Sequence, residues 1–208
     1  MTAAHWDTVM AVHDGELQSA GGEVRRLPVA RWLGHEHADE SLLGAVLDWC
    51  HGPTVDLGCG PGRIVDLLLR RGIPALGVDD SPHAVRLTRE RGAAALRRDV
   101  FAPLPGEGRW SHAILLDGNI GIGGDPARLL RRAAALVEPG GTVVVEVEPS
   151  ARGVHREAVR VRSAGGTSVW FPWAHVGFDV LDDLAVDAGL RLARRLDHSG
   201  RRCAELVR

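Results

Sequence analysis

The stretch that most constrains the fold is Val55–Arg63, which reads Val-Asp-Leu-Gly-Cys-Gly-Pro-Gly-Arg. A short apolar run ends there in an acid, three glycines follow at alternate positions, and an amphipathic helix begins. This pattern predicts a strand, a tight turn and a helix N-terminus, where backbone N–H groups and the helix dipole favour a ligand. Glycine is needed because a Cβ would block the ligand or forbid the φ angles of the turn. The turn therefore predicts a small-molecule site.

The spacing of this turn separates it from two other glycine-rich motifs. Its glycines are Gly58, Gly60 and Gly62, and Asp56 lies two residues before the first of them. The dinucleotide fingerprint is spaced G-x-G-x-x-G, with an acid about 20 residues further on. A P-loop is excluded because no Gly-Lys-Ser/Thr follows and the chain contains no lysine. The turn has the form D-x-G-x-G-x-G.

The composition describes an ordinary globular chain. Its 208 residues, 45% hydrophobic and 25% charged, suit one α/β domain with a sizeable core. A net charge of −2 gives no reason to expect nucleic acid or an anionic membrane as partner. The three cysteines are scattered, which argues against a disulfide framework or a zinc site. No signal peptide or membrane-length apolar run is evident, so a cytoplasmic location without membrane association is expected.

Predicted strands alternate with predicted helices along most of the chain. Capping residues followed by proline, at Ser81-Pro82 and Asp125-Pro126, predict two helix starts. Such alternation predicts a parallel, doubly wound sheet. The expected parallel strands are Thr54–Leu57, Ala75–Val78, Ala94–Leu96, His112–Leu116 and Thr142–Val147, followed by an antiparallel pair, Leu190–Leu196 and Cys203–Val207.

Two segments depart from this alternation. Residues 1–38 are polar and interrupted by glycine and proline, with one short helix expected near Ala4–Val12. Residues 149–176 follow the fifth strand, and two short runs around Gly165-Gly166 predict a small inserted hairpin.

The motifs and their order resemble the class I S-adenosylmethionine-dependent methyltransferases over roughly residues 40–208. The resemblance is carried by Asp56–Gly62, Gly77-Val78-Asp79 and Arg98-Asp99-Val100, each near a predicted strand end, and by the Pro139-Gly140-Gly141 turn. As a whole the chain is similar to small methyltransferases of the actinobacterial type.

This resemblance implies an α/β, Rossmann-like doubly wound sheet of seven strands, mostly parallel with a terminal antiparallel pair. Residues 39–208 would form the methyltransferase domain, with the insert at about 149–176, and residues 1–38 would cover the substrate. The implied activity is transfer of a methyl group from S-adenosyl-L-methionine to an oxygen or nitrogen of a small-molecule acceptor.

The resemblance also implies roles for the acids at the first two strand ends. Asp56 resembles the acid that engages the cofactor's amino group, and its alternative role is to brace the turn by accepting backbone N–H bonds. Asp79 resembles the acid that accepts both ribose hydroxyls. The methionine part of the cofactor is expected against the turn formed by Gly58, Cys59, Gly60 and Gly62, in which Cys59 packs as a small buried residue.

Further along, Asp99 resembles the acid that accepts a hydrogen bond from the adenine amino group, and Val100 would offer its backbone N–H to the ring. The alternative for Asp99 is surface pairing with a neighbouring arginine. Residues 117–124 occupy the position that faces the transferable methyl group. There Asp117 is a candidate for contact with the cofactor's amino group or for aligning the substrate, and Asn119 for holding a substrate hydroxyl. The stretch departs from the N-P-P-Y type, which argues against methylation of flipped nucleobases.

A general base is needed only when the acceptor arrives protonated. His175 is the candidate singled out, because it follows Trp170, Phe171, Pro172 and Trp173, which can wall an apolar acceptor. The alternative for His175 is a structural role. The run His35-Glu36-His37 lacks a third ligand, so no metal is expected.

Two other classes of function stay open at this point. One is a nicotinamide-dependent oxidoreductase, which the glycine spacing and the absence of any Tyr-x-x-x-Lys pair disfavour. The other is a regulatory protein that binds S-adenosylmethionine and transfers nothing, which the motifs do not exclude. Oligomeric state is not indicated by the sequence.

Overall fold

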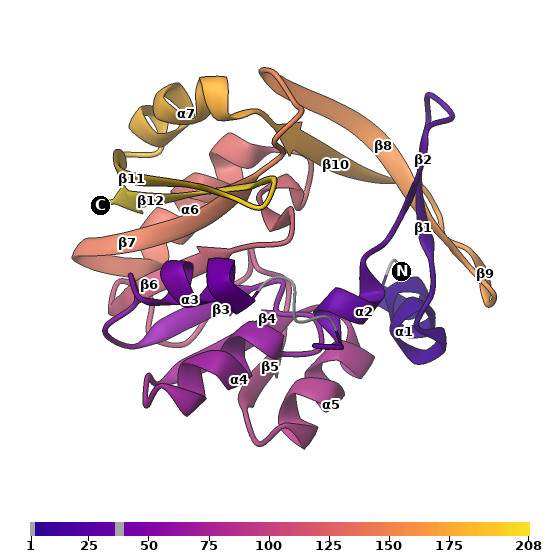
Figure 1. Cartoon of the computed structure of the whole chain (residues 1–208), viewed down its shortest axis with the longest axis horizontal. Helices are drawn as coiled ribbons and strands as arrows, with labels where there is room; N and C mark the ends of the chain where they lie inside the picture. Colours follow the sequence, from indigo (N-terminus) through magenta and orange to yellow (C-terminus); the bar gives the residue numbers. More distant parts are fainter. Residues whose placement is uncertain (1–2, 36–39) are drawn as a thin grey trace.

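The computed structural model describes residues 3–35 and 40–208, which form two β-sheets lying side by side (Figure 1). The larger sheet occupies the left of this view with helices around it, and the smaller sheet lies to its right. The strands of the larger sheet are β3 (Thr54–Leu57), β4 (Ala75–Asp79), β5 (Ala94–Arg97), β6 (Trp110–Leu115), β7 (Val137–Val147), β11 (Arg191–His198) and β12 (Arg201–Val207).

The order of the larger sheet is β11-β12-β7-β6-β3-β4-β5. Strands β3 to β7 pair in parallel, and β12 is antiparallel to both β7 and β11. The predicted seven-stranded, doubly wound sheet is therefore confirmed. The chain runs from β3 outward to β5 and then returns to β6 on the other side of β3. This reversal is a topological switch point, where open α/β sheets bind ligands beyond the carboxyl ends of their strands.

Apolar side chains of the larger sheet pack against helices on both faces. One core joins β3, β6 and β7 to α6 and α7, and a second joins the opposite face to α3 and α4. Helix α5 packs over β4 and β5. The helices are α1 (Ala3–Val12), α2 (Val29–Trp32), α3 (Glu40–Leu47), α4 (Arg63–Arg70), α5 (Pro82–Glu90), α6 (Pro126–Leu136) and α7 (Leu181–Asp187), with short 3-10 turns η1 (Asn119–Gly121) and η2 (Phe178–Val180).

The predicted starts of two helices are observed. Ser81 caps α5 by accepting a hydrogen bond from the N–H of Ala84 at 2.9 Å, and Asp125 caps α6 by accepting from Arg128 at 3.1 Å. The terminal strand pair turns at Ser199 and Gly200, both with positive φ. Strand β7 begins earlier than expected, because the Pro139-Gly140-Gly141 turn is absorbed into it as an irregularity in its pairing with β6.

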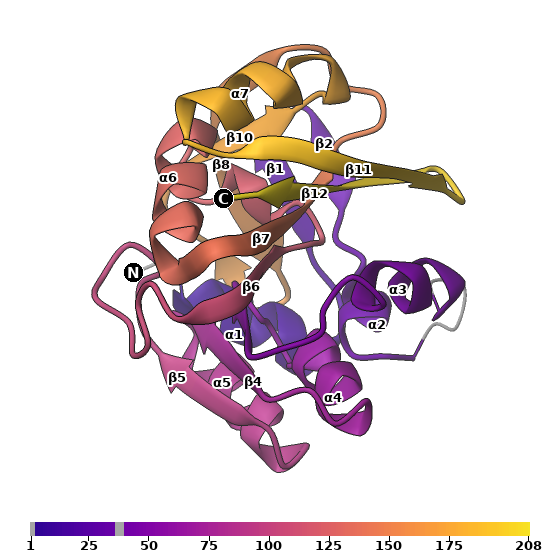
Figure 2. The same ribbon diagram turned by 90° about the vertical axis from the view of Figure 1, so that its left-hand side faces the viewer.

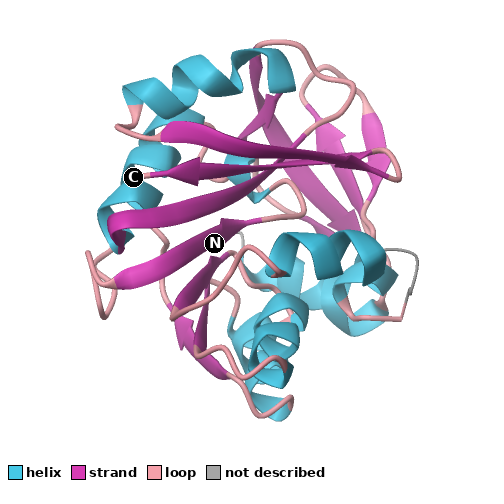
Figure 3. Ribbon diagram, turned by 60° about the vertical axis from the view of Figure 1, so that its left-hand side comes forward, coloured by secondary structure: helices cyan, strands magenta, loops and turns pink. Residues whose placement is uncertain are grey.

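The smaller sheet joins two segments that are far apart in the sequence. Its strands are β1 (Glu16–Ser19), β2 (Val24–Arg26), β8 (Val154–Ser163), β9 (Gly166–Thr167) and β10 (Phe171–Val176), in the order β10-β8-β1-β2 with β9 paired to β8. The inserted hairpin is thus present but longer than expected, and the N-terminal segment adds two strands to it that the sequence analysis did not predict. Figure 2 views the molecule from the side of the larger sheet, with the smaller sheet behind it, and Figure 3 distinguishes both sheets from the helices.

The N-terminal helices pack against one face of the smaller sheet. Trp6 of α1 makes edge contacts with Trp32 and with Phe171, whose ring centroids lie 5.9 and 6.3 Å from its own. Val9 and Val161 are fully buried in the same cluster, which also includes residues of α2 and α5. This cluster fills the space between the smaller sheet and α5. Among residues 3–35 and 40–208, every helix falls short of the length and apolarity that crossing a membrane requires.

Candidate active site

The glycine turn follows β3 and ends in α4, as the sequence predicts. Gly58, Gly60 and Gly62 all have positive φ, of 77°, 53° and 80°. A Cβ at Gly58 would lie 2.8 Å from Nδ2 of Asn119, and one at Gly62 would lie 2.6 Å from the side chain of Thr88. Among the described residues, nothing other than its chain neighbours lies within 4 Å of a Cβ built at Gly60. Close packing thus requires glycine at two of the positions, and at Gly60 the backbone borders open space.

Asp56 is buried inside this turn. Its side chain is 2% exposed, and its Oδ2 has no hydrogen-bond partner among the residues that the structure describes. Burial, followed by the charges of Asp117 and Asp79, raises the pKa of Asp56 to about 8, while Arg63 acts in the opposite direction. A buried acceptor without a partner is costly unless a ligand satisfies it.

Asp79 holds the glycine turn and the start of α5 together. Its Oδ2 accepts a hydrogen bond from the N–H of Gly60 at 2.9 Å, and its Oδ1 accepts from the N–H of Ser81 at 2.8 Å. Burial raises the pKa of Asp79, and these two backbone bonds oppose that effect. On the far side of Ser81, Asp7 of α1 accepts from the Ser81 hydroxyl and from the N–H of His83. The N-terminal helix therefore reaches the loop that carries Asp79.

Asp99 and Val100 lie just beyond β5. Asp99 is exposed, and its Oδ1 accepts from the N–H of Phe101 at 2.9 Å; no pairing of its carboxylate with a neighbouring arginine is seen among the described residues. Val100 is buried, and its carbonyl oxygen accepts from Nε of Arg132 at 3.0 Å. Asp99 therefore presents an exposed carboxylate just beyond the end of β5.

Asp117 sits in a buried network of charges at the end of β6. Its φ is 54°, and its two carboxylate oxygens accept from Nη2 of Arg63 at 2.9 Å and from Nη2 of Arg201 at 2.8 Å. Arg201 also binds both oxygens of Glu146, at 2.7 and 2.5 Å, and Glu146 accepts from the N–H of Asp117 at 2.6 Å. Arginines thus hold both carboxylate oxygens of Asp117, the candidate for contact with the cofactor's amino group or for aligning the substrate.

Asn119 and Cys59 face the interior of the turn. Nδ2 of Asn119 donates to the carbonyl oxygens of Leu57 and Gly58, at 3.0 and 2.8 Å. This amide group therefore fastens residues 117–124 to the end of β3, a role that the sequence analysis did not foresee. Cys59 is buried beside Thr88, and burial raises the pKa of its thiol well above the ordinary value.

His175 lies on β10 of the smaller sheet. Its Nε2 is 3.0 Å from Oε1 of Glu157, and its Nδ1 is 3.7 Å from Oε2 of Glu148, the residue after β7. Glu148 also binds Arg25 at 3.2 Å. Of the His35-Glu36-His37 run only His35 is described, and its ring packs against that of His13; Glu36 and His37 lie outside the described residues.

The carboxyl ends of β3, β4 and β6 thus bring Asp56, Gly60, Asp79 and Asp117 together. Sequence reasoning missed the two arginines that support this site, Arg63 and Arg201. It also missed the two glutamates that contact His175, Glu148 and Glu157. The only signal in the sequence for a role of Arg63 is its position directly after the last glycine of the turn. Arg201 lies at the start of the last strand, and no sequence pattern links it to Asp117, 84 residues away.

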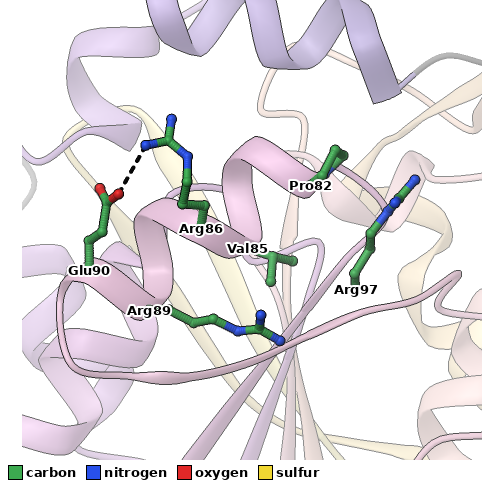
Figure 4. Close-up of a pocket in the computed structure, with 6 residues that line it drawn as sticks. All are labelled: Pro82, Val85, Arg86, Arg89, Glu90 and Arg97. Atoms are coloured by element: carbon green, nitrogen blue, oxygen red, sulfur yellow. Dashed lines mark hydrogen bonds and ion pairs between the residues drawn. The ribbon is translucent and has the colours of Figure 1, made fainter.

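A separate groove of about 510 Å³ runs along the outer side of α5 and β5 (Figure 4). It contains none of the predicted site residues. Arg86 pairs there with Glu90 at 2.9 Å. Arg89 donates a hydrogen bond to the carbonyl oxygen of Ala95 on the edge strand β5. Charged side chains of this kind protect a sheet edge from pairing with other strands.

The seven-stranded sheet, its glycine turn and the acids at its strand ends define the class I S-adenosylmethionine-dependent methyltransferases. Residues 47–186 match the family described as "Methyltransferase domain", and the chain belongs to it. S-adenosyl-L-methionine is its cofactor. This family places the chain apart from the nicotinamide-dependent oxidoreductases that the glycine turn left open.

Individual relatives match this chain either over about half of its length or at low sequence identity. A trans-aconitate 2-methyltransferase of Sinorhizobium fredii is 34% identical over 51% of this chain and 42% of its own length. A second, from Paracidovorax citrulli, is 31% identical over 51% of this chain and 45% of its own length, so the chain spans less than half of these curated relatives. A Bacteroides fragilis methyltransferase solved with S-adenosyl-L-homocysteine has a TM-score of 0.79 at 17% identity, over 99% of this chain and 93% of that one. A sugar N-methyltransferase of Streptoalloteichus has a TM-score of 0.63 at 16% identity, over 86% and 90%.

Proposed function

We propose that this methyltransferase methylates an oxygen or nitrogen atom of a small-molecule acceptor, bound between the glycine turn and the inner face of the smaller sheet. That face is the one carrying Phe171, Trp173 and His175. The observation that carries the proposal is the unpartnered, buried Oδ2 of Asp56 at the switch point of the sheet. The Asp56 carboxylate lies beside the loop of residues 117–124. This loop contacts the smaller sheet through a bridge between Ile122 and Trp173 of β10.

The chain's own residues fit the cofactor. The open space at Gly60 admits it to the backbone, the unsatisfied Asp56 suits its amino group, and Asp79 and Asp99 suit its ribose and adenine. The bound cofactor supplies an electrophilic methyl group, whose transfer breaks a carbon–sulfur bond, leaves the electron pair on sulfur and forms a bond to the acceptor atom.

The remaining residues have proposed roles in positioning. Asp117 and Asn119 hold residues 117–124 against the turn, so that an acceptor meets a preorganised surface, and orientation of this kind supplies much of the rate of an in-line displacement. His175, supported by Glu157, is the proposed proton acceptor for an acceptor that arrives protonated. Residues 1–38 and 149–176 together form the proposed cover of the acceptor.

The test uses the purified chain with S-adenosylmethionine labelled in its methyl group and a fractionated extract of small metabolites. We expect a labelled product together with an equal amount of S-adenosylhomocysteine. Binding of the cofactor without any labelled product across the fractions would instead favour a regulatory protein. Failure to bind S-adenosylhomocysteine in a calorimetric titration would remove the proposed site.

A further inference from the structure

The inner face of the smaller sheet ends in a cluster of charged side chains. Trp173 pairs in register with Glu157, and His175 pairs with His155, so these four side chains share one face. His175 and Glu157 are well buried, with side chains 10% and 15% exposed, and their contact is 3.0 Å long. Glu148 reaches the same histidine from the end of β7. His175 and Glu157 of the smaller sheet and Glu148, at the end of β7 of the larger sheet, thus lie together.

Two members of this cluster, Glu157 and His175, line a cavity of about 10 Å³, which also borders Glu23 and Arg25. A cavity of this volume holds a single group about the size of one water molecule. A primary ammonium group has this size, whereas a carboxylate is larger. The cavity also borders Leu17 and Val159, so one side of it is apolar.

The charge around the cavity is negative. Glu23 and Glu157 border the cavity with two negative charges, and Arg25 borders it with one positive charge. Glu148, behind the lining residues, adds a third negative charge through its contacts with Arg25 and His175. A cationic ligand is attracted to such a site, while an anionic ligand would bring a like charge next to partly buried carboxylates.

Aromatic side chains connect the cavity to the methyl-transfer edge of the larger sheet. Trp173 lies two residues before His175 on the same face of β10, and Phe171 makes an edge contact with it at 6.3 Å between ring centroids. A Cβ at Gly121 of η1 would lie 2.7 Å from Nε1 of Trp173. The wall therefore runs from the loop after Asp117 to the charged cluster, and aromatic faces attract organic cations as well as apolar groups.

We infer that the acceptor is an apolar or aromatic amine, whose protonated nitrogen is held by Glu157, Glu148 and His175. This inference rests on the proposed function, since it names the acceptor class of the same site. The ammonium group gives one proton to the Glu157 carboxylate or to His175. The freed lone pair on nitrogen would then form the bond to the methyl carbon as the carbon–sulfur bond breaks, so that sulfur keeps that electron pair and the positive charge of the sulfonium passes to the methylated amine. The first curated relatives act on trans-aconitate, a carboxylate, so the inference separates this chain from them.

The test compares ligands of one shape and different charge. Tryptamine, tryptophol and indole-3-propionate, and the corresponding phenyl series, are titrated into the chain saturated with S-adenosylhomocysteine, with thermal stability and heat of binding as readouts. We expect the amines to bind at least tenfold more tightly than the matching alcohols and carboxylates. We also expect the amines to be methylated on nitrogen when S-adenosylmethionine is supplied in place of S-adenosylhomocysteine.

Two variants test the cluster itself. Glu157→Gln should weaken binding of the amine about tenfold or more, because it removes one buried negative charge from the cavity. Glu16→Gln is the matched control, since Glu16 lies on the opposite face of the same sheet and its side chain is 46% exposed. It should leave amine binding unchanged.

Three results would overturn the inference: tighter binding of the carboxylates or alcohols, no binding of any amine in either series, or an amine preference that survives Glu157→Gln. Binding of S-adenosylhomocysteine alone is measured first in every titration. If it fails, the proposed function fails; if it succeeds while the carboxylate or alcohol is the ligand, the proposed cofactor site stands and only the amine is wrong.

Discussion

Asp56 is a carboxylic acid in surroundings that favour its neutral form. It is buried beside Asp79 and Asp117, and only Arg63 offsets them. A ligand that presents a positive charge or an N–H donor to its free oxygen would reverse this balance. Asp56 therefore lowers the stability of the ligand-free protein at high pH. The same buried, unpartnered oxygen is available to bind the cofactor.

The pH dependence of stability follows from this residue. The pKa of Asp56 rises from 3.8 when unfolded to about 8 when folded, so its contribution is fully present below about pH 4 and is lost as the pH rises toward 8. Asp56→Asn, which mimics the protonated acid, should flatten the fall in unfolding free energy over this range, measured by urea denaturation without cofactor. An unchanged slope would show that Asp56 does not titrate there.

Asp79 provides the second test at this scale. Asp79→Ala should weaken binding of S-adenosylhomocysteine about tenfold to a hundredfold, because a charge-assisted hydrogen bond to the ligand and the bracing of Gly60 are both lost. Asp80→Ala is the control, since this neighbour is exposed and its backbone carbonyl, which accepts from Arg97, is kept in the variant. Equal affinities of the two variants by calorimetry would exclude Asp79 from the ribose site.

At the scale of elements, β12 does more than close the sheet. Through Arg201 its first residue fixes the loop after β6 and the end of β7 in one network with Arg63. Breaking such a buried network by removing one partner leaves the other charges uncompensated. The last strand of the sheet is thereby coupled to the proposed methyl-transfer site.

Neighbouring arginines allow a matched comparison of this coupling. Arg201→Met should lower the free energy of unfolding by about 3–5 kcal/mol, because its side chain is only 8% exposed and binds two acids. Arg202→Met should cost less than about 1 kcal/mol, since Arg202 pairs with Asp197 on the surface. The measurement is urea denaturation of both variants at pH 7. Similar losses in the two variants would argue against the network.

At the scale of the molecule, α1 connects the two halves of the proposed site. Asp7 binds the loop that carries Asp79, while Trp6, the preceding residue, packs on Phe171 of the smaller sheet. Cofactor and acceptor walls therefore share one short helix. Figure 1 shows α1 between α5 and the strands of the smaller sheet.

This arrangement predicts how the cofactor affects the N-terminal helix. Binding of S-adenosylhomocysteine should slow amide hydrogen exchange at the start of α5 and also in α1, because the two are joined through Asp7 and Ser81. In Asp7→Ala the protection of α5 should remain and that of α1 should disappear. Protection of α1 that persists in this variant would show that the coupling takes another route.

Much of the larger sheet was predictable because its signals are local. A β-branched run such as Thr142–Val147 and a cap followed by proline, as at Ser81-Pro82, act through neighbouring residues, and both are observed. The smaller sheet was only half predicted. The insert has hairpin signals of its own, whereas β1 and β2 are short polar segments without them. Strand β1 pairs with β8, more than 130 residues away in the chain, and β2 pairs with β1.

The sequence alone indicated the cofactor class through its resemblance to a family, since the glycine turn and each acid at a strand end are local signals that recur in a fixed order along the chain. Tertiary structure decided which of those acids is free to act. Only folding shows that arginines occupy both oxygens of Asp117, that Asn119 fastens the loop, and that Asp56 keeps an unpartnered oxygen. The physical reason is that burial and charge pairing depend on residues far apart in the chain, which the local pattern of a sequence does not record.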